Sequence, residues 1–425
     1  MLSRTADHLF WMSRYTERAE NTARLLDVNY QTSLLPQSAE LAQLGWAGLL
    51  SISELVPAYQ ARHCEITPQQ VMEFMVKDES NPSSIISCLR AARENARAVR
   101  GSLTTEVWET QNQTWLELNR LLRSGLLERD PGQFFEWVKF RSHLSRGVTV
   151  GTMLMDESLH FMRLGTFLER ADNTARLVDV KFHAVQSDFF GAASAKDQEY
   201  DFYHWSAILR SVSGFEIYRR VYRNVIQPDR VAELLVLRPD IPRSLLSCMN
   251  EVVNNLDSVC ESSSCLSCRL AGKLRSDLKY TTIDEILKQG LHAFLVQFLE
   301  QINQIIHNAD FQKLEGAWRG LHYMVNNTET DEMLKIRVMN VSKTDLHRTL
   351  KRYKGTAWDQ SPIFKKVYEE EYGQFGGEPF GCLVGDYHFD QSAPDVELLG
   401  EMSKVAAAAH SPFITGVSPT VMQME

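Results

Sequence analysis

Residues 17–28 read ERAENTARLLDV, and residues 169–180 read ERADNTARLVDV. Ten of the twelve positions are identical at an offset of 152 residues. Wound as a helix, each copy places most of its charged and amide side chains on one side and its alanines, with Leu26 in the first copy and Val178 in the second, on the other. The repeat therefore predicts a helical fold in which one amphipathic helix occurs twice.

The polar residues of the two copies are candidates for one site. The set comprises Glu17, Arg18, Glu20, Asn21, Arg24 and Asp27, and then Glu169, Arg170, Asp172, Asn173, Arg176 and Asp179. Two interpretations are open. Each copy could form a solvated face in which Glu20 and Arg24 make a pair worth about 0.2–0.5 kcal/mol. We favour packed helices that share a polar network or ligand site, because both copies keep asparagine and arginine, and a guanidinium fork pairs with carboxylates as lysine cannot.

A third stretch, CLRAARENARAVRG, places arginines at helical spacing at Arg90, Arg93, Arg97 and Arg100. Such a stripe needs acidic partners or an anionic ligand. We expect the repeated helices to supply the acidic partners. A pocket for a phosphate or carboxylate is the alternative.

The net charge of −9 argues against a protein that coats nucleic acid, because phosphate binding needs a cationic surface. The first 21 residues lack the pattern of a signal peptide, and no segment stays apolar for the 18 residues that a membrane span requires. We therefore expect a cytoplasmic protein that binds neither nucleic acid nor membrane.

The search for chemistry predicts no catalytic residue, metal or cofactor. Cys260, Cys265 and Cys268 lie in a serine-rich stretch that we interpret as a loop of reduced cysteines, a metal site being the alternative. One E-x-x-H, Glu157 to His160, has no second copy to complete a di-metal bundle. His143 lies among arginines and suits a structural histidine better than a base, and the S-x-x-K from Ser276 to Lys279 is too short to be specific.

Composition changes along the chain. Arginine outnumbers lysine 26 to 7 over residues 1–303, whereas residues 304–425 hold 4 arginines and 8 lysines. The first segment has apolar residues at helical spacing throughout and predicts a bundle of about eight to ten helices. In the second, we predict a strand at 334–341, a helix in SKTDLHRTLKRY, a strand in GCLVGDYHFD and a helix in VELLGEMSKVAAAAH. The fold class is mainly α, an all-α bundle over 1–303 followed by a smaller α/β segment over 304–425.

The first segment resembles the bacterial alpha-E family, an all-helical domain named for its Glu-Arg motif. The resemblance rests on ERAENTAR, ERADNTAR, SCLRAARENARAVR, WVKFRSHLSRG and DFYHWSAILRSVSGFEIYRRVYR, and it extends from Met1 to about Asn303. Members have no established reaction. Their genes typically neighbour those of ATP-grasp and transglutaminase-like proteins, which implies an accessory role in making or modifying peptides. The loop at Cys260–Cys268 departs from the family's pattern.

The second segment is similar to the large subunit of the type VI secretion contractile sheath. The similar stretches are FQKLEGAWRGLHYMVNNTETDEMLKIRVMNVSK, YKGTAWDQSPIFKKVYEEEYGQFGGEPFGCLVGDY and VELLGEMSKVAAAAHSPFITGVSPTVMQM. The resemblance covers an early part of that subunit and implies the small sheath subunit as a partner.

Three functions are compatible with these features. We favour a non-catalytic adaptor whose partner is an ATP-grasp or transglutaminase-like protein, and which carries a truncated sheath fragment from a gene fusion. The second possibility is a component of the contractile sheath. The third is an enzyme that uses the Glu/Arg/Asn network as its active site.

Overall fold

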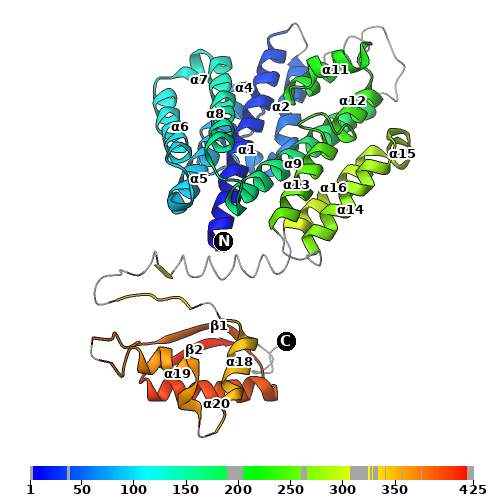
Figure 1. The fold of residues 1–425 in the computed structure, drawn as a ribbon. Coiled ribbons are helices and arrows are strands. Elements are labelled where there is room, and N and C mark those ends of the chain that lie inside the picture. The colour runs from blue at the N-terminus through cyan, green and yellow to red at the C-terminus, as the bar shows by residue number, and fades with distance from the viewer. Residues whose placement is uncertain are drawn as a thin grey trace. The chain divides into compact units, whose positions relative to one another are not determined.

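Two long helices, α1 (Ser3–Ser33) and α9 (Glu157–Asp188), carry the two copies of the repeated sequence and pack against each other. The structure is a computed structural model that describes residues 3–35, 39–188, 204–259, 266–306, 324–325, 328, 334–339, 341–355, 357–374 and 376–418. The chain divides into two units, residues 1–315 and 316–425 (Figure 1). The mainly helical fold class predicted from the sequence is confirmed.

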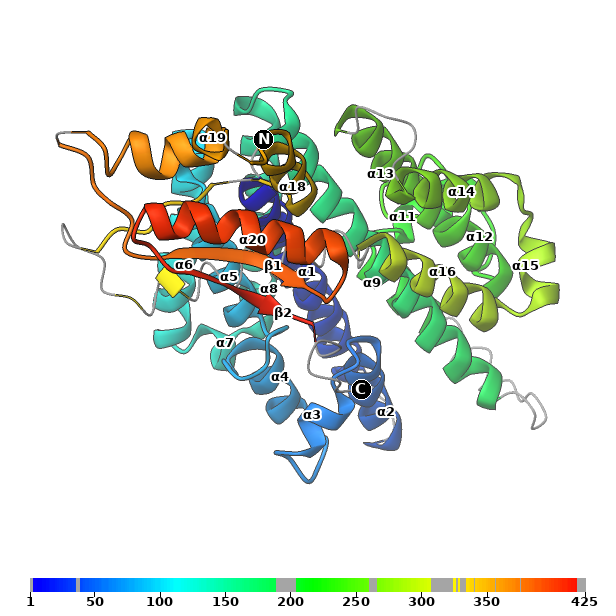
Figure 2. The ribbon, with the colours of Figure 1, turned by 90° about the horizontal axis from the view of Figure 1, so that it is seen from below.

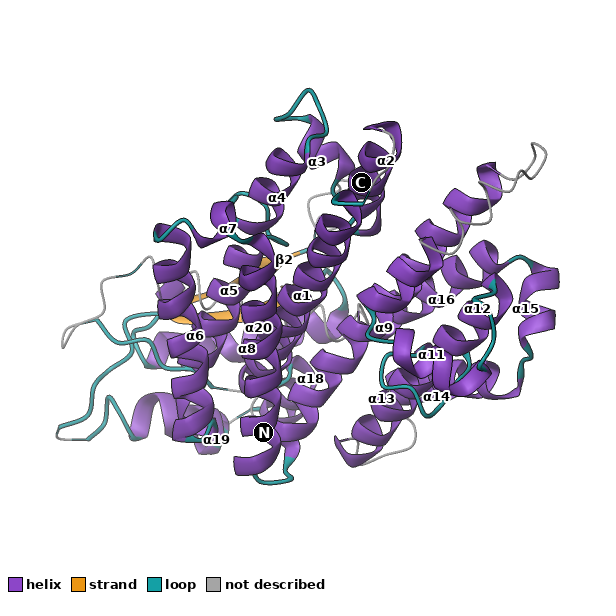
Figure 3. Ribbon diagram, turned by 90° about the horizontal axis from the view of Figure 1, so that it is seen from above, coloured by secondary structure: helices purple, strands orange, loops and turns teal. Residues whose placement is uncertain are grey.

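In the part of the first unit that the structure describes, every regular element is a helix (Figure 3). Besides α1, α9 and the helical residues 204–211, these are α2 (Ala39–Ile52), α3 (Val56–Gln60), α4 (Pro68–Val76), α5 (Ile85–Ala98), η1 (Arg100–Ser102), α6 (Thr105–Arg123), α7 (Leu126–Arg129), α8 (Pro131–Thr152), α11 (Phe215–Tyr222), α12 (Pro228–Val236), α13 (Leu245–Val259), α14 (Leu266–Tyr280), α15 (Ile283–Gln289) and α16 (Leu291–Ile306). The helices outnumber the eight to ten expected, because several are short turns between longer ones.

Helix starts follow local chemistry. Thr67 accepts a hydrogen bond from the backbone N–H of Gln70, and Pro68 occupies the first turn of α4. Ser84 caps α5 in the same way through the N–H of Ser87. Both helices therefore begin where a capping side chain and, for α4, a proline favour the first turn.

The arrangement around α1 recurs around α9. Helix α1 packs on α5 and α8, and α9 packs on α13 and α16. Each half of the unit also has a buried tryptophan in a shorter helix. These are Trp46 in α2 and Trp205 in the helical residues 204–211. The long helices pass close to each other at Gly165, where an added Cβ would lie only 2.2 Å from the carbonyl oxygen of Phe10. Only a residue without a side chain fits this crossing.

The expected boundary after Asn303 lies inside α16, which continues to Ile306. Cys268 lies within α14 rather than in a loop, because that helix begins at Leu266. The remaining loop cysteines, Cys260 and Cys265, lie outside the described residues.

The second unit contains a two-stranded parallel sheet in the residues that the structure describes. Strand β1 (Leu383–Phe389) pairs with β2 (Phe413–Val417), and α20 (Ala393–Ala408) connects them and packs on the sheet (Figure 2). The other elements are α18 (Lys343–Arg352), η2 (Trp358–Gln360), α19 (Pro362–Phe364) and η3 (Lys365–Glu369). The predicted second strand and both predicted helices are confirmed.

The strand predicted over 334–341 is wrong. Residues 334–339 and 341 have irregular structure, and Leu334, Val338 and Met339 are exposed. The alternating pattern supplies side chains for two faces, but a strand also needs a neighbour for its backbone groups. No described strand pairs with this stretch.

Candidate functional site

The two Glu-Arg dipeptides bind each other reciprocally. Arg18 donates from Nε to Glu169 Oε1 at 2.6 Å and from Nη2 to Oε2 at 2.9 Å. Arg170 donates from Nε to Glu17 Oε1 at 2.9 Å and from Nη2 to Oε2 at 3.1 Å. Each arginine of one copy thus holds the glutamate of the other in a two-pronged contact, the strongest hydrogen-bond geometry open to these side chains.

Further arginines reach the same two glutamates. Arg14 donates to Glu169 Oε2 at 2.6 Å, and Arg146 donates to Glu17 Oε2 at 2.7 Å. Arg243 lies 3.1 Å from Glu17 Oε1. Each carboxylate therefore faces more than one guanidinium group.

Glu20 is fully buried, one turn beyond Glu17 on α1. Arg24 and Arg243 donate to its Oε1 at 2.8 and 2.6 Å, and Arg146 and Ser142 donate to its Oε2 at 2.5 and 2.7 Å. We call the connected set the glutamate–arginine core; its members are Glu17, Glu20, Glu169, Arg14, Arg18, Arg24, Arg146, Arg170 and Arg243.

Burial and ion pairing oppose each other in this core. Burial disfavours the charged form of Glu169, but Arg18 and Arg14 outweigh it and lower its pKa to about 2. Glu20 behaves alike, its pKa held well below the usual range by Arg243, Arg146 and Arg24 against the effect of burial. The carboxylates are therefore charged at neutral pH and are unsuited to general acid or base catalysis.

One edge of the core reaches the surface at His143, an exposed residue of α8. Arg146 Nη2 lies 2.6 Å from its Nδ1, and Arg24 Nη2 lies 3.3 Å from its Nε2. Arg24 also donates to the hydroxyl of Ser213 at 2.6 Å. Asn21 Oδ1 accepts from Arg243 at 2.7 Å beneath this edge.

The corresponding place on the second copy is simpler. Asp172, which replaces Glu20, accepts from Arg176 at 2.9 and 3.2 Å. Arg176 also pairs with Glu54. Both side chains of the Asp172–Arg176 pair are partly exposed.

The remaining candidates of the repeat lie outside the core. Asp27 binds Lys139 at 2.8 Å, and Asp179 lies 2.6 Å from Nδ1 of His292. Asn173 is half-buried. The structure thus brings the Glu-Arg dipeptides, Glu20, Asn21 and Arg24 together and leaves these acids in separate contacts.

The arginine stripe of α5 does not use the repeated helices as acidic partners. Arg90 binds Glu79, and Arg93 binds Asn112 and Glu94. The later contacts are Arg97 with Glu94 and Arg100 over the ring of Trp108. The expectation about its partners is wrong, because the stripe faces nearby loops, α6 and its own helix.

Arg14, Arg146 and Arg243 were not predicted as site residues. Arg146 is one of the arginines that flank His143 in the sequence. Arg243 stands in the loop before α13, 223 residues after Glu20, and nothing in its local sequence distinguishes it. The signal that could have found these residues is charge balance, since two buried helices with paired acids and bases need further partners for their remaining oxygen atoms.

Nucleophilic and metal chemistry finds little support in the described residues. Burial raises the pKa of the Cys88 and Cys248 thiols to about 12, so neither supplies a thiolate at neutral pH. His160 Nδ1 lies 2.8 Å from Asn255 Oδ1, and Ser276 donates to its own helix at Gly272. Among these residues no group of three or more metal-ligating side chains is found.

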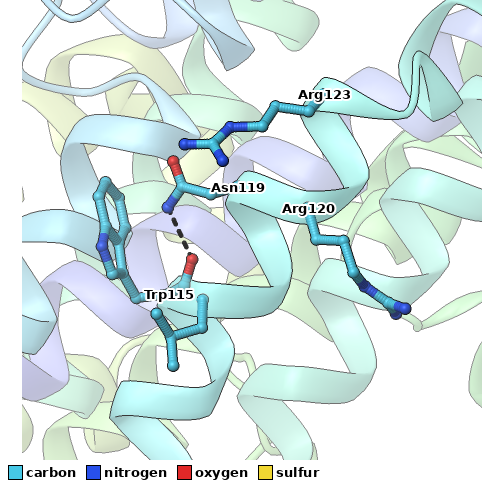
Figure 4. Close-up of a pocket in the computed structure, with 5 residues that line it drawn as sticks. Trp115, Asn119, Arg120 and Arg123 are labelled. Atoms are coloured by element: carbon cyan, nitrogen blue, oxygen red, sulfur yellow. Dashed lines mark hydrogen bonds between the residues drawn. The ribbon is translucent and has the colours of Figure 1, made fainter.

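A shallow pocket lies on α6, away from the core. Trp115, Leu116, Asn119, Arg120 and Arg123 line it, all from one helix (Figure 4). The amide of Asn119 donates to the carbonyl of Trp115 at 2.8 Å. A single exposed helix face gives no enclosed site for chemistry.

The sequence model of Alpha-E, described as a predicted alpha-helical domain with a conserved ER motif, matches residues 1–309. The chain belongs to the Alpha-E family. The reciprocal contacts of Glu17-Arg18 and Glu169-Arg170 give that ER motif a structural role in this member. An uncharacterized protein of Mycobacterium bovis and one of Mycobacterium tuberculosis are each 26% identical over 329 residues, which cover 71% of this chain and 35% of theirs.

The VipB tail sheath N-terminal domain matches residues 294–425. Over 124 residues, 29% of this chain, the sequence is 77% identical to the type VI secretion system sheath protein TssC1 of Pseudomonas aeruginosa, of which it covers 25%. The chain thus spans about a quarter to a third of the length of the curated relatives it matches. In the residues described, no helix is long and apolar enough to cross a membrane.

Proposed function

We propose that this Alpha-E protein acts in a type VI secretion sheath, where residues 316–425 bind a sheath subunit and the helical unit serves as a non-catalytic scaffold. The single observation that carries the proposal is the 77% identity to a sheath protein over 124 residues. Identity at that level preserves most surface residues as well as the core. We therefore rank the sheath role above the adaptor role that the sequence alone favours.

The open face of the small sheet supports a protein partner. Val384 and Ile414 are register partners in β1 and β2 and are 61% and 57% exposed. The other face packs on α20 through Phe389, Met402 and Val405. Parallel sheets are normally covered on both faces, so the uncovered apolar pair favours association with another chain.

The scaffold role rests on how the charged groups are used. Glu17, Glu20 and Glu169 are buried and ion-paired, and their pKa values lie below the usual range because arginines outweigh the effect of burial. Groups fixed this way hold helices together rather than exchange protons. We propose that the protein works in the cytoplasm, and cell fractionation tests this location directly.

Co-purification with the small sheath subunit tests the proposal. The full chain should retain that subunit at matched stoichiometry, and V384D and I414D should each abolish retention, because a charge on the apolar face opposes its burial. L154D is the matched control, since Leu154 is 80% exposed but lies in the helical unit. Failure of the full chain to bind, or loss of binding only in L154D, would reject the sheath role.

A second candidate is an accessory role beside ATP-grasp and transglutaminase-like proteins. The resemblance to the alpha-E family implies this role, and the Alpha-E domain covers residues 1–309. The two repeated motifs, residues 17–28 and 169–180, would then belong to a scaffold for such a partner. Capture of either protein by the full chain, unaffected by V384D, would favour this role over the first.

A further inference from the structure

The glutamate–arginine core holds six guanidinium groups and only three carboxylates in mutual contact. Arginine stays protonated inside proteins, so positive groups outnumber negative ones in this set, and Asp172 near Arg18 is one further carboxylate beside it. The excess is notable in a chain whose formal net charge is −9. Uncompensated buried charge is costly, and a bound anion is one way to balance it.

The contacts of His143 show where donors lack acceptors. Although the residue is exposed, its neighbours shield part of the ring from water, and this desolvation lowers its pKa below the usual 6.5. Glu20 opposes the shift and the cations Arg146, Arg24 and Arg243 add to it, so the ring is neutral at pH 7. A neutral imidazole has one acceptor nitrogen and one N–H. Both nitrogens nevertheless face guanidinium nitrogens, at 2.6 Å from Arg146 and 3.3 Å from Arg24. In one of the two contacts a donor therefore faces a donor.

Asn21 adds a second donor without an acceptor. The residue is 3% exposed, and its Oδ1 is bound to Arg243. Its Nδ2 finds no hydrogen-bond partner among the described residues. A buried amide N–H without an acceptor costs about 1–3 kcal/mol.

The site is open to ligand from outside. His143 and Ser213 are exposed, and the side chain of Arg146 is 28% exposed, whereas Arg24 and Asn21 lie beneath them. Ser213 has a positive φ of 55°, and its hydroxyl accepts from Arg24. The guanidinium group of Arg146 is thus partly accessible at this edge, and that of Arg24 lies on the other side of the His143 ring.

We propose that Arg24, His143 and Arg146 form a binding site for an oxyanion, the carboxylate or phosphate group of a small ligand. Guanidinium groups bind both groups well through paired N–H donors. The ligand's oxygen atoms accept from Arg24 and Arg146 where these now meet the ring of His143. This inference does not depend on the sheath role, since it concerns the helical unit alone.

Calorimetric titration of the full chain tests the site, with sodium phosphate in one arm and sodium glutamate in the other. Ionic strength is held constant with sodium chloride. We expect saturable binding in at least one arm, and the stronger arm identifies the ligand chemistry. At about ten times the Kd the melting temperature should rise by roughly 1–4 °C.

The variant R24Q should weaken binding by about tenfold or more, because it removes a charged donor. R176Q is the matched control, since Arg176 is the corresponding arginine of the second copy and lies outside the site; it should bind as the wild type does. If R24Q misfolds, H143A decides, because His143 is exposed and its removal should change affinity without loss of fold. Equal binding by R24Q and R176Q, an unchanged H143A, or no response beyond that of chloride would overturn the proposal.

Discussion

The surroundings of α1 and of α9 are alike in their framework and unlike in their charge. His8 meets Asn95 at 2.7 Å, and His160 meets Asn255 at 2.8 Å. The Sγ atoms of Cys88 and Cys248 lie 3.7 and 3.8 Å from the carbonyl oxygens of prolines six residues earlier. Glu54 and Ser213 have φ values of 54° and 55°, and each contacts the arginine of the opposite copy. In these contacts the surroundings of the two long helices match.

The difference lies beside Glu20. Lys139 binds Asp27 as His292 meets Asp179, which aligns α8 with α16. With Lys139 aligned to His292, α16 holds Leu295, Val296 and Leu299 where α8 holds Ser142, His143 and Arg146. The shared contacts therefore hold the two long helices together, while the added cations belong to one side alone. That asymmetry separates the structural role of the repeat from a ligand-binding one.

The largest expected effect compares Glu20 with Asp172. E20Q should lower the free energy of unfolding by about 3–5 kcal/mol, because it removes the carboxylate that Arg24 pairs with and leaves Arg146 and Arg243 to share Glu17 alone. D172N should cost about 1 kcal/mol or less, since its pair is partly exposed. Urea denaturation of both variants measures the difference. Equal losses would show that the two sides are energetically the same.

The pH dependence of unfolding tests the ion pair that Glu169 of α9 makes with Arg18. The folded-state pKa of Glu169 is about 2, below the ordinary 4.5, because Arg18 and Arg14 outweigh burial. Its stabilisation is therefore present above pH 4.5 and is lost as the pH falls towards 2, in total about 3 kcal/mol. Unfolding of the wild type and of E169Q should be followed from pH 6 downwards. The gap between them should narrow across that range, and a constant gap would contradict the ion-pair account.

The crossing of the long helices gives the next effect. G165A should cost about 2–3 kcal/mol, because its methyl group would meet the backbone oxygen of Phe10 at 2.2 Å and force the helices apart. The residue at the same place in the first copy is Ser13, which already carries a Cβ. S13A should cost about 0.5 kcal/mol or less. Thermal unfolding distinguishes the two, and a harmless G165A would mean that the close approach is not required.

The helical framework was predictable because its signals are local. The spacing of alanines and leucines in ERAENTARLLDV gives the buried face, and Thr67-Pro68 marks a helix start. The contact between the two copies was inferred from Glu17 and Glu169 because their arginines and asparagines recur. A short window of sequence is enough to predict each of these features.

The cationic side of the site was not predictable in the same way. Arg243 and Arg146 reach Glu20 from distant parts of the chain, and a single arginine has no pattern that reveals its partner. The alternating stretch at 334–341 failed for a related reason, since a strand depends on a neighbour that its own residues do not specify. In each case the missing information was a long-range contact.

The smallest expected effect compares Lys139 with His292, the two partners of the outer aspartates. The Lys139 side chain is 13% exposed and that of Asp27 6%, whereas His292 is 53% exposed. K139Q should therefore cost about 1–2 kcal/mol and H292Q about 0.5 kcal/mol or less, because screening by water weakens the exposed contact. Urea denaturation in low and in high salt measures both. H292Q could instead lower the free energy of unfolding more than K139Q does. The charge asymmetry would then not extend beyond Glu20, and the excess cations would be a local feature of the site rather than of the whole α1 side.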